Sequence, residues 1–230
     1  MKVTCVLSTL RAGFVEHALD MFHTQEWPDK ELILVEAASA PYSGSLPPQA
    51  RKVRAPGGLG WGRRINLGIA EASGEIVHRL DDDDYYAPKF LERAVKELEK
   101  HPLCYWDRFA VYFAQRGEMR TVQGAFVCGS TVFRKADLAQ NPYPDVNRAI
   151  DYRMIEAARN AGIQASRVTD AAALFVYARH GADNWKTTWA FLGGKTTELA
   201  VDDLLHSRSN PAPAYLLPAE QADYYRGIAR

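Results

Sequence analysis

Four consecutive aspartates at the end of a short apolar run constrain the fold of this chain more than any other feature. Residues 74–80 begin with Gly-Glu and continue as Ile-Val-His-Arg-Leu, a run that favours a β-strand, and residues 81–84 are all Asp. Pro88 then opens the next helical stretch. Adjacent carboxylates repel one another, so a fold that gathers them at the mouth of a strand usually has a cation to neutralise them. The plainer interpretation is an acidic turn that contacts only solvent.

Strands and helices alternate before the aspartates. Residues 3–7 form a continuous apolar run typical of a strand buried on both faces, and residues 14–22 carry the apolar stripe of a helix. Residues 31–36 predict a second buried strand, and a short strand is expected around 52–54. The β-α-β order, with about 20 residues between strands, suits a right-handed parallel crossover.

The second half of the chain predicts a change of strand direction. After an amphipathic helix over 89–100, residues 105–116 and 121–133 are rich in aromatic and β-branched residues. A Gly-Glu step separates the two runs and favours an antiparallel strand pair. A helix over 149–161 and a late strand over 174–177 complete the expected pattern. The sheet should therefore be mixed, with parallel strands first.

The composition excludes several classes of protein. At 230 residues, of which 47% are hydrophobic, the chain can fill a sizeable core. Lys plus Arg and Asp plus Glu both number 28, so no net charge attracts nucleic acid or an anionic membrane. The three cysteines are far apart and lack paired metal spacing, which indicates free thiols in a reducing compartment. With no signal-peptide pattern and no apolar run of the roughly 20 residues that span a membrane, we expect a cytoplasmic protein without a transmembrane segment.

A glycine-rich loop, residues 56–64, precedes a predicted helix over 65–72. Such a loop allows close approach to phosphate and offers backbone N–H groups, here together with Arg63 and Arg64. Its spacing matches neither a P-loop nor a dinucleotide fingerprint. A flexible loop with surface arginines is the alternative interpretation.

The combined pattern resembles the GT-A glycosyltransferases, specifically the large inverting group called family 2. The glycine loop, Asn66, Gly68, the Gly-Glu pair and the strand that ends in Asp-x-Asp-Asp carry the resemblance, which extends from residue 3 to about residue 180. It implies an α/β fold of the GT-A, Rossmann-like type, a three-layer α/β/α sandwich around a mixed, mostly parallel central sheet.

The resemblance also implies a division of the chain. We expect a single GT-A domain over 1–190 and a helical or irregular C-terminal arm over 191–230. Within the domain, the nucleotide-sugar half should occupy about 1–100 and the acceptor half about 101–190.

An active site follows from the same resemblance. A divalent cation, Mn²⁺ or Mg²⁺, would be held by Asp83 and His180, and Asp151 would act as the general base. Structural roles are the alternatives for both, a packed histidine for His180 and a helix cap for Asp151. The other residues expected to bind the donor are Ser8, Thr9, Leu10, Glu36, Gly58, Arg64, Asn66, Asp81 and Asp82. The residues expected on the acceptor side are Trp106, Gly129, Ser130 and Trp185.

Two positions depart from the family pattern. The family usually has Glu-Asp at the site of the base, whereas this chain has Ile150 before Asp151. The second strand usually ends in two aspartates, whereas here it ends in Glu36 followed by Ala37. Glu36 can still accept a hydrogen bond from a base N–H, although its side chain is one methylene longer.

The expected function is transfer of a sugar from a nucleoside-diphosphate sugar, with UDP as the favoured nucleotide, to an acceptor hydroxyl with inversion. The acceptor stays open among a saccharide, a lipid-linked group, a small molecule, a protein and a modified nucleobase. The alternatives are a sugar nucleotidyltransferase, an Asp-dependent phosphatase and a non-catalytic nucleotide-sugar binding protein of the same fold.

Overall fold

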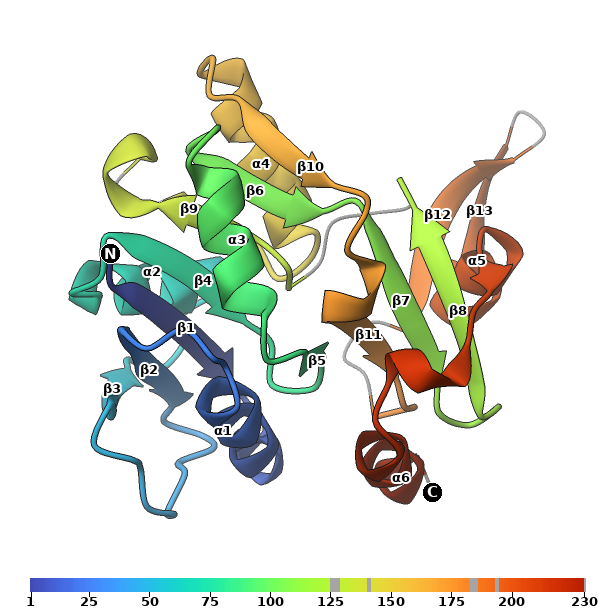
Figure 1. The fold of residues 1–230 in the computed structure, drawn as a ribbon, viewed down its shortest axis with the longest axis horizontal. Helices are drawn as coiled ribbons and strands as arrows, with labels where there is room; N and C mark the ends of the chain where they lie inside the picture. Colours follow the sequence, from blue (N-terminus) through green and yellow to red (C-terminus); the bar gives the residue numbers. More distant parts are fainter. Residues whose placement is uncertain (125–128, 140–141, 183–185, 193–194, 230) are drawn as a thin grey trace.

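A computed structural model describes residues 1–124, 129–139, 142–182, 186–192 and 195–229 of the chain (Figure 1). Its largest feature is a seven-stranded sheet with the order β10-β6-β9-β4-β1-β2-β3. The strands are β1 (Val3–Thr9), β2 (Lys30–Ala37), β3 (Ala50–Ala55), β4 (Ile76–Leu80), β6 (Leu103–Trp106), β9 (Val132–Arg134) and β10 (Ala165–Val168). Only β9 runs antiparallel to its neighbours within this sheet. The expected mixed, mostly parallel sheet is confirmed.

Helices cover both faces of this sheet, because the side chains of a strand alternate between the two faces. Val3, Cys5 and Leu7 of β1 pack in one core with α1 (Val15–His23) and α3 (Phe90–Leu98). Val6 of β1 packs in a second core with α2 (Trp61–Glu71) and α4 (Ile150–Asn160). The two cores give the three layers expected from the sequence (Figure 1).

A second sheet lies beside the first and has the order β14-β8-β7-β11-β5. Its strands are β5 (Tyr85–Tyr86), β7 (Arg108–Phe113), β8 (Glu118–Gln123), β11 (Phe175–Arg179) and β14 (Asn210–Pro211). The antiparallel pair expected around the Gly-Glu step is present as β7 and β8. The sequence prediction was wrong in treating each run as one strand, because the first run divides at Asp107 into β6 and β7, which belong to different sheets. The second run likewise divides into β8 and β9, and β9 inserts between β4 and β6.

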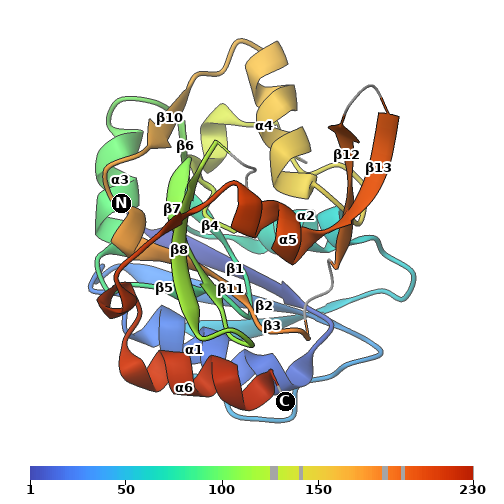
Figure 2. The same cartoon turned by 90° about the vertical axis from the view of Figure 1, so that its right-hand side faces the viewer.

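The C-terminal arm is folded onto the rest of the chain. A hairpin of β12 (Thr187–Leu192) and β13 (Lys195–Ala200) leads to α5 (Val201–Ser207), and the chain ends in α6 (Ala219–Ile228). β14 pairs with β8, and α6 lies alongside α1 (Figure 2). Residue 190, where the sequence predicts the end of the GT-A domain, lies within β12 of this hairpin. The division of the chain into a domain over 1–190 and an arm over 191–230 stays a prediction. Short 3-10 turns occur at Ala12–Phe14, Lys135–Asp137, Ala172–Leu174 and Ala214–Leu216. Among the described residues, no helix has the length and apolar character needed to cross a membrane.

Candidate active site

The carboxyl ends of three neighbouring strands meet at one edge of the central sheet. β1 lies between β2 and β4, and the register pairs Thr9 with Glu36 and Leu7 with Leu80. The residues that follow β4 therefore emerge beside the end of β1, at the edge where open α/β sheets bind ligands. Thr9 Oγ1 donates a hydrogen bond to Asp82 Oδ2, so two of the residues expected to bind the donor are in contact.

Arg11 brings a cation to the acidic run. Its Nη2 atom contacts Asp82 Oδ1 and lies 2.7 Å from Asp83 Oδ2, and its Nε donates to Asp82 Oδ2 at 3.2 Å. Burial and the charge of Asp83 raise the pKa of Asp82 to about 6, even though Arg11 acts in the opposite direction. One guanidinium thus faces two carboxylates, which leaves this part of the site with excess negative charge.

His180, the residue after β11, also contacts Asp83. Its Nε2 atom lies 3.1 Å from Asp83 Oδ2, and the backbone N–H of Ala182 donates to its Nδ1 at 3.3 Å. Because Nδ1 accepts a hydrogen bond, this network assigns the proton of the neutral ring to Nε2, facing Asp83. Burial alone would raise the pKa of Asp83, but the hydrogen bond from His180 and the charge of Arg11 hold it well below its usual range.

This arrangement fits a divalent cation in part. The portion of the chain that the structure describes contains no group of three His, Cys, Asp or Glu side chains placed to hold a metal ion. Asp83 and His180 nevertheless offer a carboxylate oxygen and an imidazole nitrogen, a donor set compatible with Mn²⁺ or Mg²⁺. Binding at Nε2 requires the ring proton to move to Nδ1, because only a nitrogen lone pair can bind a metal. Asp83 and His180 are thus two candidate ligands, and their role in metal binding stays a prediction. The oxygens of a bound diphosphate are suited to supply further ligands.

Arg79 of β4 joins the predicted donor carboxylate to the predicted base. Its Nη2 lies 2.8 Å from Asp81 Oδ2, its Nη1 contacts Asp81 Oδ1, and its Nε lies 2.9 Å from Asp151 Oδ1. Thr131 Oγ1 also donates to Asp151 Oδ1, at 3.1 Å, and the guanidinium lies 5.1 Å from the centre of the Trp61 ring. Burial raises the pKa of Asp151, and Arg79 opposes that shift. The guanidinium therefore holds both carboxylates in a fixed relation.

Gly129 approaches Asp81 so closely that a side chain does not fit. A Cβ atom placed there would contact Asp81 Oδ2 and lie 2.6 Å from the hydroxyl oxygen of Tyr86. That hydroxyl donates to Gly129 O at 2.8 Å and accepts from the backbone N–H of Asp81 at 3.1 Å. Gly129 and Tyr86 thus fix the start of the acidic run, and the expected acceptor role of Gly129 stays a prediction.

The glycine loop and the end of β1 are also in contact. Arg64 donates from Nε to Ser8 Oγ at 3.3 Å and from Nη1 to Leu59 O at 3.0 Å. Gly58 adopts a φ of +81°, a conformation that glycine reaches without strain. Leu10 is 50% exposed at the same strand end. Their roles in donor binding stay predictions.

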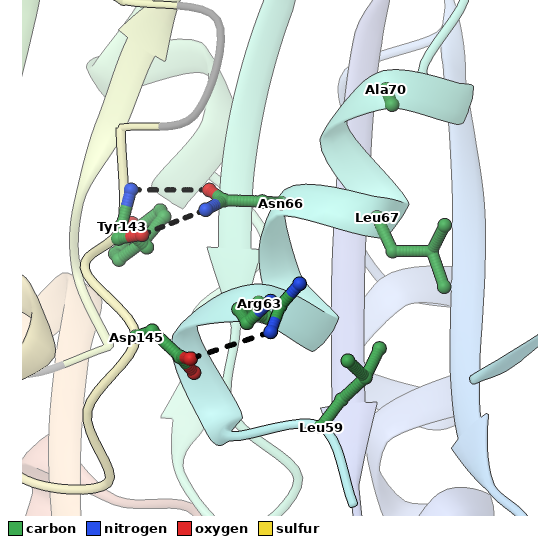
Figure 3. Close-up of a pocket in the computed structure, with 7 residues that line it drawn as sticks. All are labelled: Leu59, Arg63, Asn66, Leu67, Ala70, Tyr143 and Asp145. Atoms are coloured by element: carbon green, nitrogen blue, oxygen red, sulfur yellow. Dashed lines mark hydrogen bonds and ion pairs between the residues drawn. The ribbon is translucent and has the colours of Figure 1, made fainter. Parts of the chain in front are cut away.

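The side chain of Asn66 makes two hydrogen bonds with the backbone of Tyr143. Its Nδ2 donates to Tyr143 O at 2.7 Å, and its Oδ1 accepts from the Tyr143 N–H at 3.1 Å (Figure 3). In this structure the side chain positions the loop at Tyr143, and donor binding by Asn66 stays a prediction. A pocket of about 590 Å³ lies here, and none of residues 81–84 is part of its lining, which is Leu59, Arg63, Asn66, Leu67, Ala70, Tyr143 and Asp145.

Two residues expected on the acceptor side lie in the core. Trp106 is 0% exposed, its ring stacks on Phe90 with centroids 4.3 Å apart, and its Nε1 donates to Ala171 O. A ring packed in this way has no free face for a sugar, so the expectation for Trp106 is corrected because burial of a large aromatic side chain in the core is the stronger tendency. Ser130 is also fully buried, and its Oγ accepts from the N–H of Trp106. Trp185 lies outside the described residues.

The sequence interpretation missed two cations of the site, Arg11 and Arg79. A signal was present for Arg79, because a charged residue inside a strand buried on both faces needs a charged partner. Arg79 and Asp81 are two residues apart, the spacing that places side chains on the same face of a strand. For Arg11, only its closeness to the end of β1 pointed to the site.

The comparisons with known proteins agree with this fold and identify the family. The sequence model described as "Glycosyl transferase family 2" matches residues 5–158. An uncharacterized glycosyltransferase, alr2836, of Nostoc sp. (strain PCC 7120) is 30% identical over 108 residues, which are 43% of this chain and 33% of that protein. The chain therefore spans about a third of the length of this curated relative.

Solved structures share the fold at low sequence identity. The mannosyltransferase PcManGT of Pyrobaculum calidifontis, solved with GDP-Man and Mn²⁺, superimposes with a TM-score of 0.60 at 17% identity, covering 99% of this chain and 72% of that one. S. aureus TarS 1–349 in complex with UDP-GlcNAc gives a TM-score of 0.58 at 18% identity, covering 80% and 60%. At such identities the likeness establishes the fold, and the family follows from the match over residues 5–158, which includes the acidic run and Asp151. The chain belongs to glycosyl transferase family 2.

Proposed function

We propose that this protein transfers a sugar from a nucleoside-diphosphate sugar, with UDP as the favoured nucleotide, to an acceptor hydroxyl with inversion. The observation that carries the proposal is the bridge from Asp81 through Arg79 to Asp151, which sets the acidic run beside a second buried carboxylate. Family membership and the nucleotide sugars bound by TarS and PcManGT support the donor class. The acceptor stays open among a saccharide, a lipid-linked group, a small molecule, a protein and a modified nucleobase. A cytoplasmic location, expected from the free thiols, belongs to the proposal.

The donor would lie along the carboxyl ends of β1, β2 and β4. The residues proposed to contact it are Ser8, Thr9, Leu10, Glu36, Gly58, Arg64, Asn66, Asp81 and Asp82. Asp83 and His180 would hold Mn²⁺ or Mg²⁺, which when bound stabilises the charge that develops on a diphosphate leaving group. The excess negative charge around Asp82 and Asp83 supports this placement.

Asp151 would take the proton of the acceptor hydroxyl. A base on the side of the sugar away from the leaving group favours direct displacement, which inverts the anomeric carbon. Burial raises the pKa of Asp151 and so makes it a stronger base, while Arg79 and Thr131 hold Oδ1 and fix the orientation of the carboxylate. Its side chain is only 5% exposed, which shields the base from bulk water.

The test separates an enzyme from a non-catalytic binder. UDP- and GDP-sugars are screened for Mn²⁺-dependent thermal stabilisation and for release of the nucleotide, first with the wild type. Asp151→Asn should then retain donor affinity and lose transfer or hydrolysis by roughly 10²–10⁴-fold, because the amide cannot take the proton. Asp137→Asn, an exposed aspartate paired with Arg134, is the matched control and should keep full activity. Full turnover by Asp151→Asn would remove Asp151 from the chemistry, and no stabilisation by any nucleotide sugar would contradict the donor class.

A further inference from the structure

The C-terminal helix α6 reaches the carboxylate segment, defined here as residues 81–84, through a buried histidine of α1. His17 is 5% exposed, and its Nε2 lies 3.2 Å from the backbone oxygen of Asp84 and 2.9 Å from the hydroxyl oxygen of Tyr225. A carbonyl oxygen can only accept, so this contact assigns a proton to His17 Nε2. Tyr225, which is 0% exposed, completes the surroundings of that nitrogen. Tyr225 of α6 thus contacts the histidine that donates a hydrogen bond to the backbone of the carboxylate segment.

Helix α6 also packs against His180, through the ring of Tyr225. The rings of Tyr225 and His180 are nearly parallel, with an angle of 9° and centroids 6.2 Å apart. The ring centroids of Phe14 and His180 are 5.4 Å apart, and Tyr224 stacks on His17 with ring centroids 4.4 Å apart. Two consecutive tyrosines of α6 therefore contact the two histidines that touch the carboxylate segment.

Asp84 shows how firmly this end of the carboxylate segment is held. Its side chain is 0% exposed, and its Oδ1 accepts from the backbone N–H of Ala178 at 3.0 Å. Its backbone oxygen faces His17, which Tyr225 holds. β11 and the pair of helices α1 and α6 thus fix Asp84 independently, one residue after Asp83. Because Asp84 directly follows Asp83, a shift of His17 against the backbone oxygen of Asp84 would be passed along the backbone to Asp83.

We propose that Tyr225 is a positioning residue of the active site, which acts through His17 and His180 to set the carboxylate segment and Asp83 for binding a diphosphate with its divalent cation. This inference rests on the proposed function. It assigns a role to α6, which lies outside the 5–158 span that matches the family. The arm is therefore part of the site in this chain, and its removal should weaken metal-dependent binding of the nucleotide.

The first experiment tests the coupling without any ligand. Tyr225→Phe keeps the ring and removes only the hydroxyl, and native-state hydrogen exchange of the full chain is followed residue by residue. Exchange should become about 3- to 10-fold faster at the amides of 84–86, the loss expected for one buried hydrogen bond. The amides of α4, which packs in the other core, should be unchanged, as should every amide in Tyr215→Phe, whose tyrosine is 81% exposed. Unchanged exchange at 84–86 would overturn the proposal.

The second experiment measures the consequence for binding. UDP is titrated calorimetrically into wild type, Tyr225→Phe, Tyr225→Leu and Tyr215→Phe, in millimolar Mn²⁺ and in EDTA. We expect the affinity in Mn²⁺ to fall about 3- to 10-fold in Tyr225→Phe and further in Tyr225→Leu, which also removes the ring behind His180, with no change in EDTA. Variants that lose stability to urea but keep the Mn²⁺-dependent affinity within twofold would show a purely structural role and refute the inference. A wild type that binds UDP equally with and without Mn²⁺ would instead overturn the proposed metal site, while the exchange experiment still decides whether α6 is coupled to the carboxylate segment.

Discussion

Replacing Arg79 by Met should destabilise the protein strongly and in a pH-dependent way. The guanidinium is 4% exposed and lies against Asp81 and Asp151, whose side chains are 14% and 5% exposed. Methionine keeps much of the length of the side chain and removes the charge. Since removing one partner of a buried ion pair costs about 3–5 kcal/mol, we expect a loss of that size at pH 7.

The pH dependence follows from the carboxyl group that is left without a partner. A buried Asp151 without Arg79 takes up a proton, at a cost of about 1.4 kcal/mol for each pH unit above its ordinary pKa, or about 4 kcal/mol at pH 7. At pH 5 the same cost falls to about 2 kcal/mol. Asp81 adds less, because burial already raises its pKa to about 7 in the wild type. The variant therefore approaches the wild type in stability as the pH is lowered.

Urea unfolding of wild type and Arg79→Met, followed by tryptophan fluorescence and circular dichroism, measures the loss of unfolding free energy at pH 5 and at pH 7. Arg51→Met is the matched control, because its ion pair with Glu71 is about half exposed and such pairs contribute little. Arg79→Met combined with Asp151→Asn should recover part of the loss at pH 7, since an amide needs no proton. A loss below about 1 kcal/mol at both pH values would refute the view that Arg79 compensates buried carboxylates.

Three further predictions concern the metal, the acidic run and the thiols. Asp83→Asn should abolish the Mn²⁺ dependence of UDP binding measured by calorimetry, and an unchanged dependence would exclude Asp83 as a ligand. Burial raises the pKa of Asp81 from 3.8 to about 7, so its contribution to stability in metal-free protein is full below about pH 4 and is lost as the pH rises to about 7. The free energy of unfolding of the wild type should accordingly fall more steeply with pH than that of Asp81→Asn over this range. If the two proteins lose stability in parallel, the raised pKa of Asp81 is contradicted. Burial also raises the pKa of Cys5 to about 12, so iodoacetamide at pH 8 should modify Cys5 only after unfolding, as mass spectrometry of the labelled peptides can check.

Much of the fold was predictable because its signals are local. The apolar runs of β1 and β2 and the stripe of α1 follow from periodicity within a few residues, and strand and helix are the ways in which such runs satisfy their backbone groups. The same holds for β4 and the aspartates that end it, since parallel strands bring their carboxyl ends to one edge. Placing Thr9, Glu36 and Asp82 at that edge thus needed only the order of the elements.

Packing in three dimensions set which distant groups became partners. Asp107 divides one β-favouring run between two sheets, because β6 pairs with β9 and β10 while β7 pairs with β8 and β11, and no local pattern encodes that choice. Residue type did not tell whether Trp106 would bind a sugar or fill the core, since an indole ring suits both. The bridge through Arg79 and the contact of Tyr225 with His17 join residues 72 and 208 positions apart. Local sequence signals were enough for β1, β2, β4, α1 and the edge where the carboxylates gather. The charge partners of those carboxylates were set by packing, because an ion pair depends on distance in space and not on separation along the chain.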